Sequence, residues 1–146
     1  APPARARALA LAAVRETFEE VGLLLARPAP PRPGTGPWRE FLAQGALPDL
    51  AALDFVARAV TPAISPKRFD ARFFMAEAEH LISLERQGDC GELDEIAWFE
   101  LDEALGLDLP SVTRFVLREI PLRLEDPTRP APSLRFARGR QRLVHL

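Results

Sequence analysis

The stretch from Leu9 to Val21 constrains the fold of this chain more than any other, because its apolar side chains recur at helical spacing. Gly22 follows directly, where a helix often ends on a glycine in the left-handed conformation. Successive apolar residues lie three or four positions apart and form one stripe along a helix: Leu11, Val14, Phe18 and Val21. We predict a helix over residues 9–21 that packs this stripe against a core and ends at Gly22.

The same helix carries three glutamates on the side away from the stripe. Glu16, Glu19 and Glu20 are related as i, i+3 and i+4, so their carboxylates share one face within one turn. Like charges at this spacing repel, and a hard divalent cation such as Mg²⁺ would relieve the repulsion. Arg15 can reach Glu19, four positions on, and orient its carboxylate. A solvated charged face without a metal is the alternative explanation.

Composition excludes several classes of protein. The chain has 146 residues, 47% of them hydrophobic, which is enough for one globular domain with a single core. A formal net charge of −2 provides no basic field for a nucleic acid, and no apolar run reaches the roughly 20 residues of a membrane span. Cys90 is the only cysteine, so no intrachain disulfide forms and we expect a cytoplasmic location. The replacement of lysine by arginine, with Lys67 the sole lysine, favours a bacterial source with a GC-rich genome.

Short helices and strands are predicted along the rest of the chain. Helices are expected at Trp38–Gln44, Leu101–Leu105 and Pro110–Ile120. Strands are expected at Leu53–Val60, Arg68–Ala78, Glu95–Phe99 and, near the end of the chain, Leu134–Phe136. The segment 53–60 also fits a helix, but its apolar residues alternate and Pro62 ends it, so we prefer a strand.

The connecting segments are marked by proline, glycine and small polar residues. A turn at Ser65–Lys67 would join two of the predicted strands as a hairpin, and Gln87–Gly91 is predicted to be a loop. The segment Arg27–Pro37 is too rich in proline and glycine for regular structure, whereas Leu23–Leu25 is expected to be extended. These elements predict a mixed α/β domain with few strands.

The string Arg15-Glu16-x-x-Glu19-Glu20-x-Gly22-Leu23 resembles the helical half of the Nudix signature. Further segments are similar to the coenzyme A diphosphatase-like branch of Nudix hydrolases: Ala13–Pro28, Trp38-Arg39, Arg68–Ala78 and Gly91–Phe99. The resemblance implies an α/β/α sandwich around a mixed sheet, formed by a single domain over residues 1–146 with a Pro-rich insertion at about 27–37. It also implies Mg²⁺ or Mn²⁺, with Glu16, Glu19 and Glu20 as ligands, and cleavage of a nucleoside diphosphate linked to another moiety.

Two parts of the Nudix pattern are not matched. The signature begins with a glycine and has a further glutamate, and at its standard spacing these fall on Ala1 and Arg7. The strands that normally precede the signature are also missing. We therefore expect a chain that is incomplete at its N-terminus, in which a homodimer is one way to complete the sheet.

The remaining candidate site residues are less specific. One glutamate that does not bind the metal would act as general base towards a metal-activated water, and the catalytic candidates are Glu19, Arg15 and Glu92. The resemblance assigns Glu92 a metal-binding or base role, with a solvated loop acid as the alternative. Arg68 and Arg72 are candidates for contact with substrate phosphate, although surface arginines are common here. The histidines and Cys90 receive no role, and the aromatic residues, including Trp38 and Trp98, are interpreted as packing residues in preference to base-stacking ones.

Three hypotheses about function follow. The first is a metal-dependent Nudix pyrophosphohydrolase acting on a small nucleotide-type substrate, with coenzyme A or an acyl derivative as a candidate. The second is a catalytically silent, Nudix-like regulatory module that binds a nucleotide. The third is an interaction domain in which the motif arose by chance.

Overall fold

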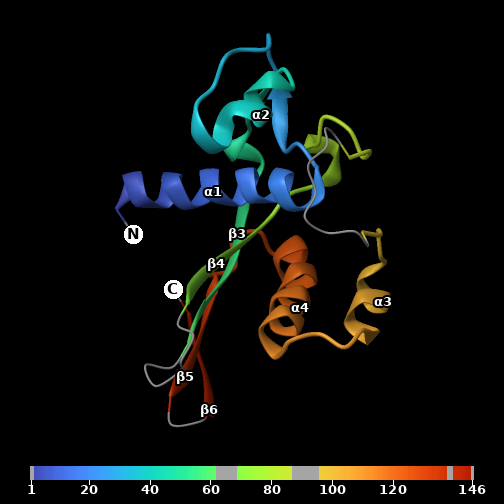
Figure 1. Ribbon diagram of the computed structural model, residues 1–146. Helices are drawn as coiled ribbons and strands as arrows, with labels where there is room; N and C mark the ends of the chain where they lie inside the picture. Colours follow the sequence, from blue (N-terminus) through green and yellow to red (C-terminus); the bar gives the residue numbers. More distant parts are fainter. Residues whose placement is uncertain (1, 62–68, 87–95, 138–139, 146) are drawn as a thin grey trace. The chain divides into compact units, whose positions relative to one another are not determined.

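The computed structural model divides the chain into two compact units (Figure 1). One unit contains Ala1–Asp54 and Ala76–Ala97, and the other contains Phe55–Met75 and Trp98–Leu146. The structure describes residues 2–61, 69–86, 96–137 and 140–145.

The first unit consists of one long helix and several short elements. In chain order these are α1 (Pro3–Val21), β1 (Ala26–Pro28), η1 (Gly36–Trp38), α2 (Arg39–Ala43), β2 (Ala46–Pro48), η2 (Leu50–Ala52) and η3 (Ala78–His80), where η marks a 3₁₀ helix. Strands β1 and β2 pair antiparallel, with Arg27 opposite Leu47. Leu25 forms an isolated antiparallel bridge with Leu81, which ties the segment after η3 to the strand that follows α1.

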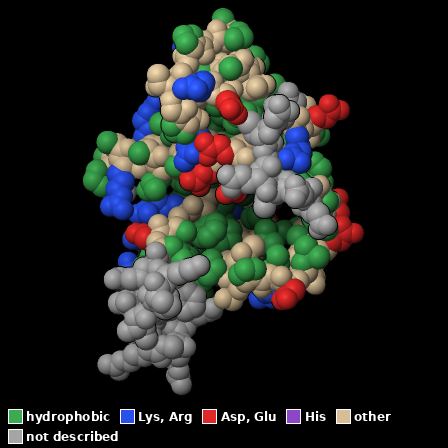
Figure 2. All heavy atoms as spheres, in the orientation of Figure 1, with side chains coloured by type: hydrophobic (Ala, Val, Ile, Leu, Met, Phe, Trp, Pro, Cys, Tyr) green, Lys and Arg blue, Asp and Glu red, His purple; other side chains and the backbone are tan. Residues whose placement is uncertain are grey.

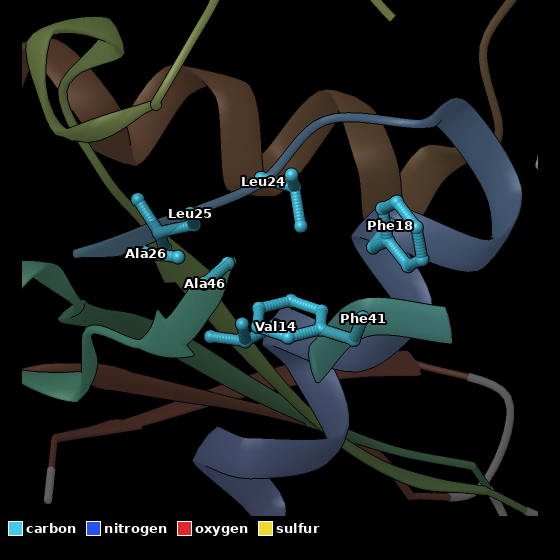
Figure 3. Close-up of a cluster of buried hydrophobic side chains, with 7 residues drawn as sticks. All are labelled: Val14, Phe18, Leu24, Leu25, Ala26, Phe41 and Ala46. Carbon is cyan, nitrogen blue, oxygen red and sulfur yellow. The ribbon is translucent and has the colours of Figure 1, made fainter. Parts of the chain in front are cut away.

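The core of this unit lies between α1, β1, β2 and α2. Its seven buried side chains are shown in Figure 3: Val14, Phe18, Leu24, Leu25, Ala26, Phe41 and Ala46. Phe41 is at the centre of an aromatic group, because its ring centroid lies 5.5 Å from that of Phe18 and 5.2 Å from that of Trp38, both edge to face. The helix α1 is therefore anchored through its apolar stripe.

The second unit is built on a four-stranded mixed sheet. Its elements are β3 (Asp54–Val60), β4 (Asp70–Met75), α3 (Leu101–Gly106), α4 (Ser111–Glu125), β5 (Pro132–Ala137) and β6 (Arg140–His145). The strand order is β4-β3-β5-β6, in which β3 and β5 are parallel and β5 and β6 antiparallel. The buried side chains of Val56, Ala57, Ala59 and Leu134 come from the two central strands.

Several predicted elements are confirmed and others are shifted. The helix after Trp38, the strand over 53–60, the helix from Leu101 and the strand over 134–136 are all present, as is a mixed α/β fold with a mixed sheet. The predicted strand 68–78 is confirmed only over Asp70–Met75. The turn predicted at 65–67 and the loop predicted at 87–91 lie outside the described residues.

One predicted strand and one predicted helix boundary were wrong. Glu95–Phe99 was predicted as a strand, but its described part, residues 96–99, has no regular structure and is exposed. The helix predicted to end at Ile120 continues as α4 through Pro121 to Glu125. A proline inside a helix removes one N–H donor and crowds the preceding turn, but here the helix continues for four further residues. No described helix has both the length and the apolar character needed to cross a membrane.

A candidate metal-binding helix

Helix α1 begins six residues before the predicted start. Residues 4–8 are exposed and alternate alanine with arginine, so they have high helix propensity but no apolar periodicity that would have marked them in the sequence. Pro3 is the first helical residue, a position where its missing N–H costs nothing. The helix ends as predicted at Gly22, which has φ 74° and ψ 15° and donates its N–H to the carbonyl of Phe18 at 2.8 Å.

The predicted division of this helix into an apolar and an acidic side is confirmed. Val14 and Phe18 are each 1% exposed, whereas Glu16 and Glu20 are exposed and Glu19 is half-buried. The burial of the apolar stripe therefore orients the helix and leaves the carboxylates towards solvent. Figure 2 shows acidic and basic side chains next to one another over this helix.

Arg15 organises two of the three carboxylates. Its guanidinium forms the predicted i,i+4 ion pair with Glu19 and a second contact, at 3.3 Å, with Oε1 of Glu16. The side chain of Glu16 remains 58% exposed and that of Glu19 34% exposed. Within the described part of the chain, Glu20 makes no hydrogen bond or ion pair. Two carboxylates are thus held by one arginine, and the third is free to take a ligand.

The oxygen donors on α1 suit a hard divalent cation in type and accessibility. Glu16 and Glu20 are one helical turn apart, both reach solvent, and each has at least one carboxylate oxygen not bound by Arg15. In the conformation described here, no group of three or more His, Cys, Asp or Glu side chains among the described residues is positioned to hold a metal ion. A cation would therefore require rotation of exposed glutamate side chains.

The other predicted site residues lie in the second unit or outside the described residues. Arg72 lies on β4 in the second unit, where its Nη1 donates to Oδ1 of Asp70 at 3.3 Å and its side chain is 14% exposed. Glu92 and Arg68 lie outside the described residues. Of the two tryptophans, Trp38 packs on Phe41 as predicted, whereas Trp98, for which structural packing was also preferred, is 65% exposed.

Two contacts were missed by the sequence analysis. Nε of Arg86 donates to the carbonyl of Val21 at 3.1 Å, across 65 positions, and so places a positive charge at the C-terminal end of α1, where the helix dipole favours it. Arg58 on β3 forms a two-point ion pair with Asp70 on β4, with N···O distances of 2.7 and 2.8 Å. Neither contact has a local signal in the sequence, because each joins segments whose pairing is set by the fold.

No family model, curated protein or solved structure matches the chain. The function of the chain is therefore inferred from helix α1 and its charged residues.

Proposed function

We propose that this chain is a metal-dependent hydrolase of the Nudix type, which cleaves the pyrophosphate of a nucleoside diphosphate linked to another moiety. The observation that carries the proposal is the construction of α1. Its buried stripe of Val14 and Phe18 faces the core, Gly22 closes the helix in the left-handed conformation, and Glu16 and Glu20 reach solvent beside an Arg15–Glu19 ion pair.

Four charged residues of α1 have roles in the proposed mechanism. Glu16 and Glu20 would hold the divalent cation, Mg²⁺ or Mn²⁺, with Glu19 as the third candidate ligand. Held by these glutamates, a divalent cation would supply positive charge for the pyrophosphate and activation of a water molecule. Arg15 keeps one oxygen of Glu19 engaged, which fixes the direction of that carboxylate. A glutamate that is not bound to the cation, either Glu19 or Glu92, would accept the proton from the attacking water.

The substrate class follows from the same chemistry. A divalent cation held on α1 would neutralise the negative charge of a pyrophosphate. Coenzyme A and its acyl derivatives contain such a pyrophosphate and are the first compounds to test.

Glu20→Gln in the full-length protein is the direct test. The substitution keeps the shape of the side chain but removes the charge, and Glu20 has no described ion pair whose loss would disturb the fold. We expect Mg²⁺-dependent release of a nucleotide product to fall by on the order of 10²-fold or more. Glu125→Gln, at the exposed end of α4, is the matched control and should keep full turnover.

The outcomes separate the competing hypotheses. Undiminished turnover in Glu20→Gln would exclude the mechanism. Tight nucleotide binding by the wild-type protein, with no product after long incubation with Mg²⁺ or Mn²⁺, would show a binding module instead of an enzyme. The absence of any stabilisation by these metals would favour an interaction domain.

A further inference from the structure

A cluster of charged side chains lies on one face of the sheet in the second unit. Arg58 on β3 donates from Nε and Nη2 to the two carboxylate oxygens of Asp70 on β4, at 2.7 and 2.8 Å. Arg72, two residues further along β4, donates from Nη1 to Oδ1 of Asp70 and to the carbonyl of Asp70, both at 3.3 Å. Two guanidinium groups therefore share one carboxylate.

The register of the sheet adds a third arginine to this face. Arg58 pairs with Ser133 and Val60 pairs with Arg135 in the parallel ladder between β3 and β5. Paired residues in a sheet point to the same side, and so do residues two apart on one strand, so Arg135 shares the face of Arg58. Arg135 is exposed, and the register places Arg142 of β6 directly opposite it.

The charges on this face do not balance. Arg58 and Arg72 supply two positive charges to one carboxylate, that of Asp70, and Arg135 adds a third positive charge to the same face. The other acid on this face of β3, Asp54, is four residues from Arg58, which corresponds to about 13 Å along a strand. The described part of the face thus has an excess of positive charge around Arg58 and Arg135.

The ion pairs with Asp70 also prepare the arginines for an anionic ligand. Hydrogen bonding to Asp70 raises the pKa of Arg58 above its ordinary value. A guanidinium has five N–H donors, so the contacts with Asp70 leave donors on both Arg58 and Arg72. Their side chains are only 24% and 14% exposed, so their conformations are restricted before a ligand binds.

We propose that the face formed by Arg58, Arg72 and Arg135, with Asp70 as the residue that orients the first two, is a binding site for a phosphate or pyrophosphate group. Arginine forks match the geometry of phosphate oxygens, and the exposed Arg135 provides the open side of the site. The assignment of this phosphate group to a nucleotide-type substrate rests on the proposed function. The existence of the anion site does not depend on the proposed function.

Titration of the full-length protein with inorganic pyrophosphate in the presence of EDTA tests the proposal without turnover. Arginine Nε–H resonances or calorimetry would report binding. Arg135→Gln removes an exposed charge with little risk to folding, and we expect it to weaken pyrophosphate binding by about tenfold, the effect of one lost charge-assisted contact. Arg118→Gln removes the same charge from an exposed position on α4, outside the three proposed binding residues, and should change the affinity less than about twofold.

Three results would overturn the proposal. These are no binding of pyrophosphate by the wild-type protein at about 10 mM, equal weakening by the two arginine substitutions, or a preference for a single-stranded oligonucleotide over pyrophosphate. The hydrolase proposal is tested separately by Glu20→Gln, which should lose turnover and keep pyrophosphate binding in EDTA. Binding that depends on Arg135 in a protein without hydrolase activity would refute the proposed function and leave the anion site standing.

Discussion

Replacing Phe18 with alanine tests whether the core holds the acidic helix in place. Phe18 is 1% exposed, and its ring meets that of Phe41 edge to face at 5.5 Å. A buried phenylalanine removes about 150–200 Å² from water, which at about 25 cal/mol per Å² corresponds to about 4–5 kcal/mol. Alanine keeps a small part of this burial and leaves a cavity, so we expect the free energy of unfolding to fall by about 3–5 kcal/mol.

Urea denaturation followed by tryptophan fluorescence is the appropriate assay. Trp38 lies 5.2 Å from the ring of Phe41 and reports on this core, and a Trp98→Phe background removes the signal of the exposed tryptophan. With an m-value of about 2 kcal/mol per M, the midpoint should move down by about 2 M. If the alanine variant does not fold, Phe18→Leu gives a smaller loss on the same scale.

The control is Phe69→Ala, because Phe69 is 44% exposed. We expect a change within about 1 kcal/mol there. If Phe18→Ala were no more destabilising than Phe69→Ala, the packing of α1 on this core would be refuted, and with it the orientation of the glutamates.

Two further predictions concern the helix end and an acidic turn. Gly22→Ala should lower the free energy of unfolding by about 1–2 kcal/mol, because φ is 74° at this position. Gly106→Ala is the control and should be nearly neutral, because φ is not positive there and an added Cβ would meet no atom within 4 Å. Similar losses of stability for the two variants in thermal denaturation would contradict this reasoning. The pKa of Asp126 is lowered because the hydroxyl and the backbone N–H of Thr128 donate to its carboxylate at 2.6 and 3.0 Å. Its stabilisation is therefore present above the ordinary aspartate pKa of about 4 and is lost as the pH falls through the lowered value. Thr128→Val should destabilise the protein at neutral pH more than in acid, and an equal effect of Thr128→Val at both pH values would exclude this explanation.

Local patterns were sufficient to predict much of α1. The stripe that includes Val14 and Phe18, the closing glycine Gly22 and the pair Arg15–Glu19 all depend on residues no more than four positions apart, and the structure has each of them. The start of the helix was missed because residues 4–8 face solvent and have no apolar periodicity. The helix propensity of residues 4–8 was thus a weaker indication of helix than the apolar periodicity of the buried residues.

Strand prediction was less reliable, because a strand is stable only when a partner is available for its backbone. The alternating segment 53–60 became a central strand between β4 and β5. The equally apolar segment ending at Phe99 did not form a strand in its described part, and Trp98 and Phe99 are exposed. A residue has high β-propensity when its side chain fits the half-buried surface of a sheet, and the sequence does not show where that surface will form.

The sequence by itself determined the acidic helix, its apolar anchor and its end, because helical geometry converts spacings of three and four residues directly into faces. Only the tertiary structure decided which distant charges meet. Arg58 and Asp70 are 12 positions apart and Arg86 and Val21 are 65 apart, and Arg135 joins the face of Arg58 only through the register of two parallel strands. Such contacts depend on strand pairing and on the path of the chain, and no local sequence pattern predicts either of these. The candidate metal ligands could therefore be read from the sequence, whereas the candidate anion site required the fold.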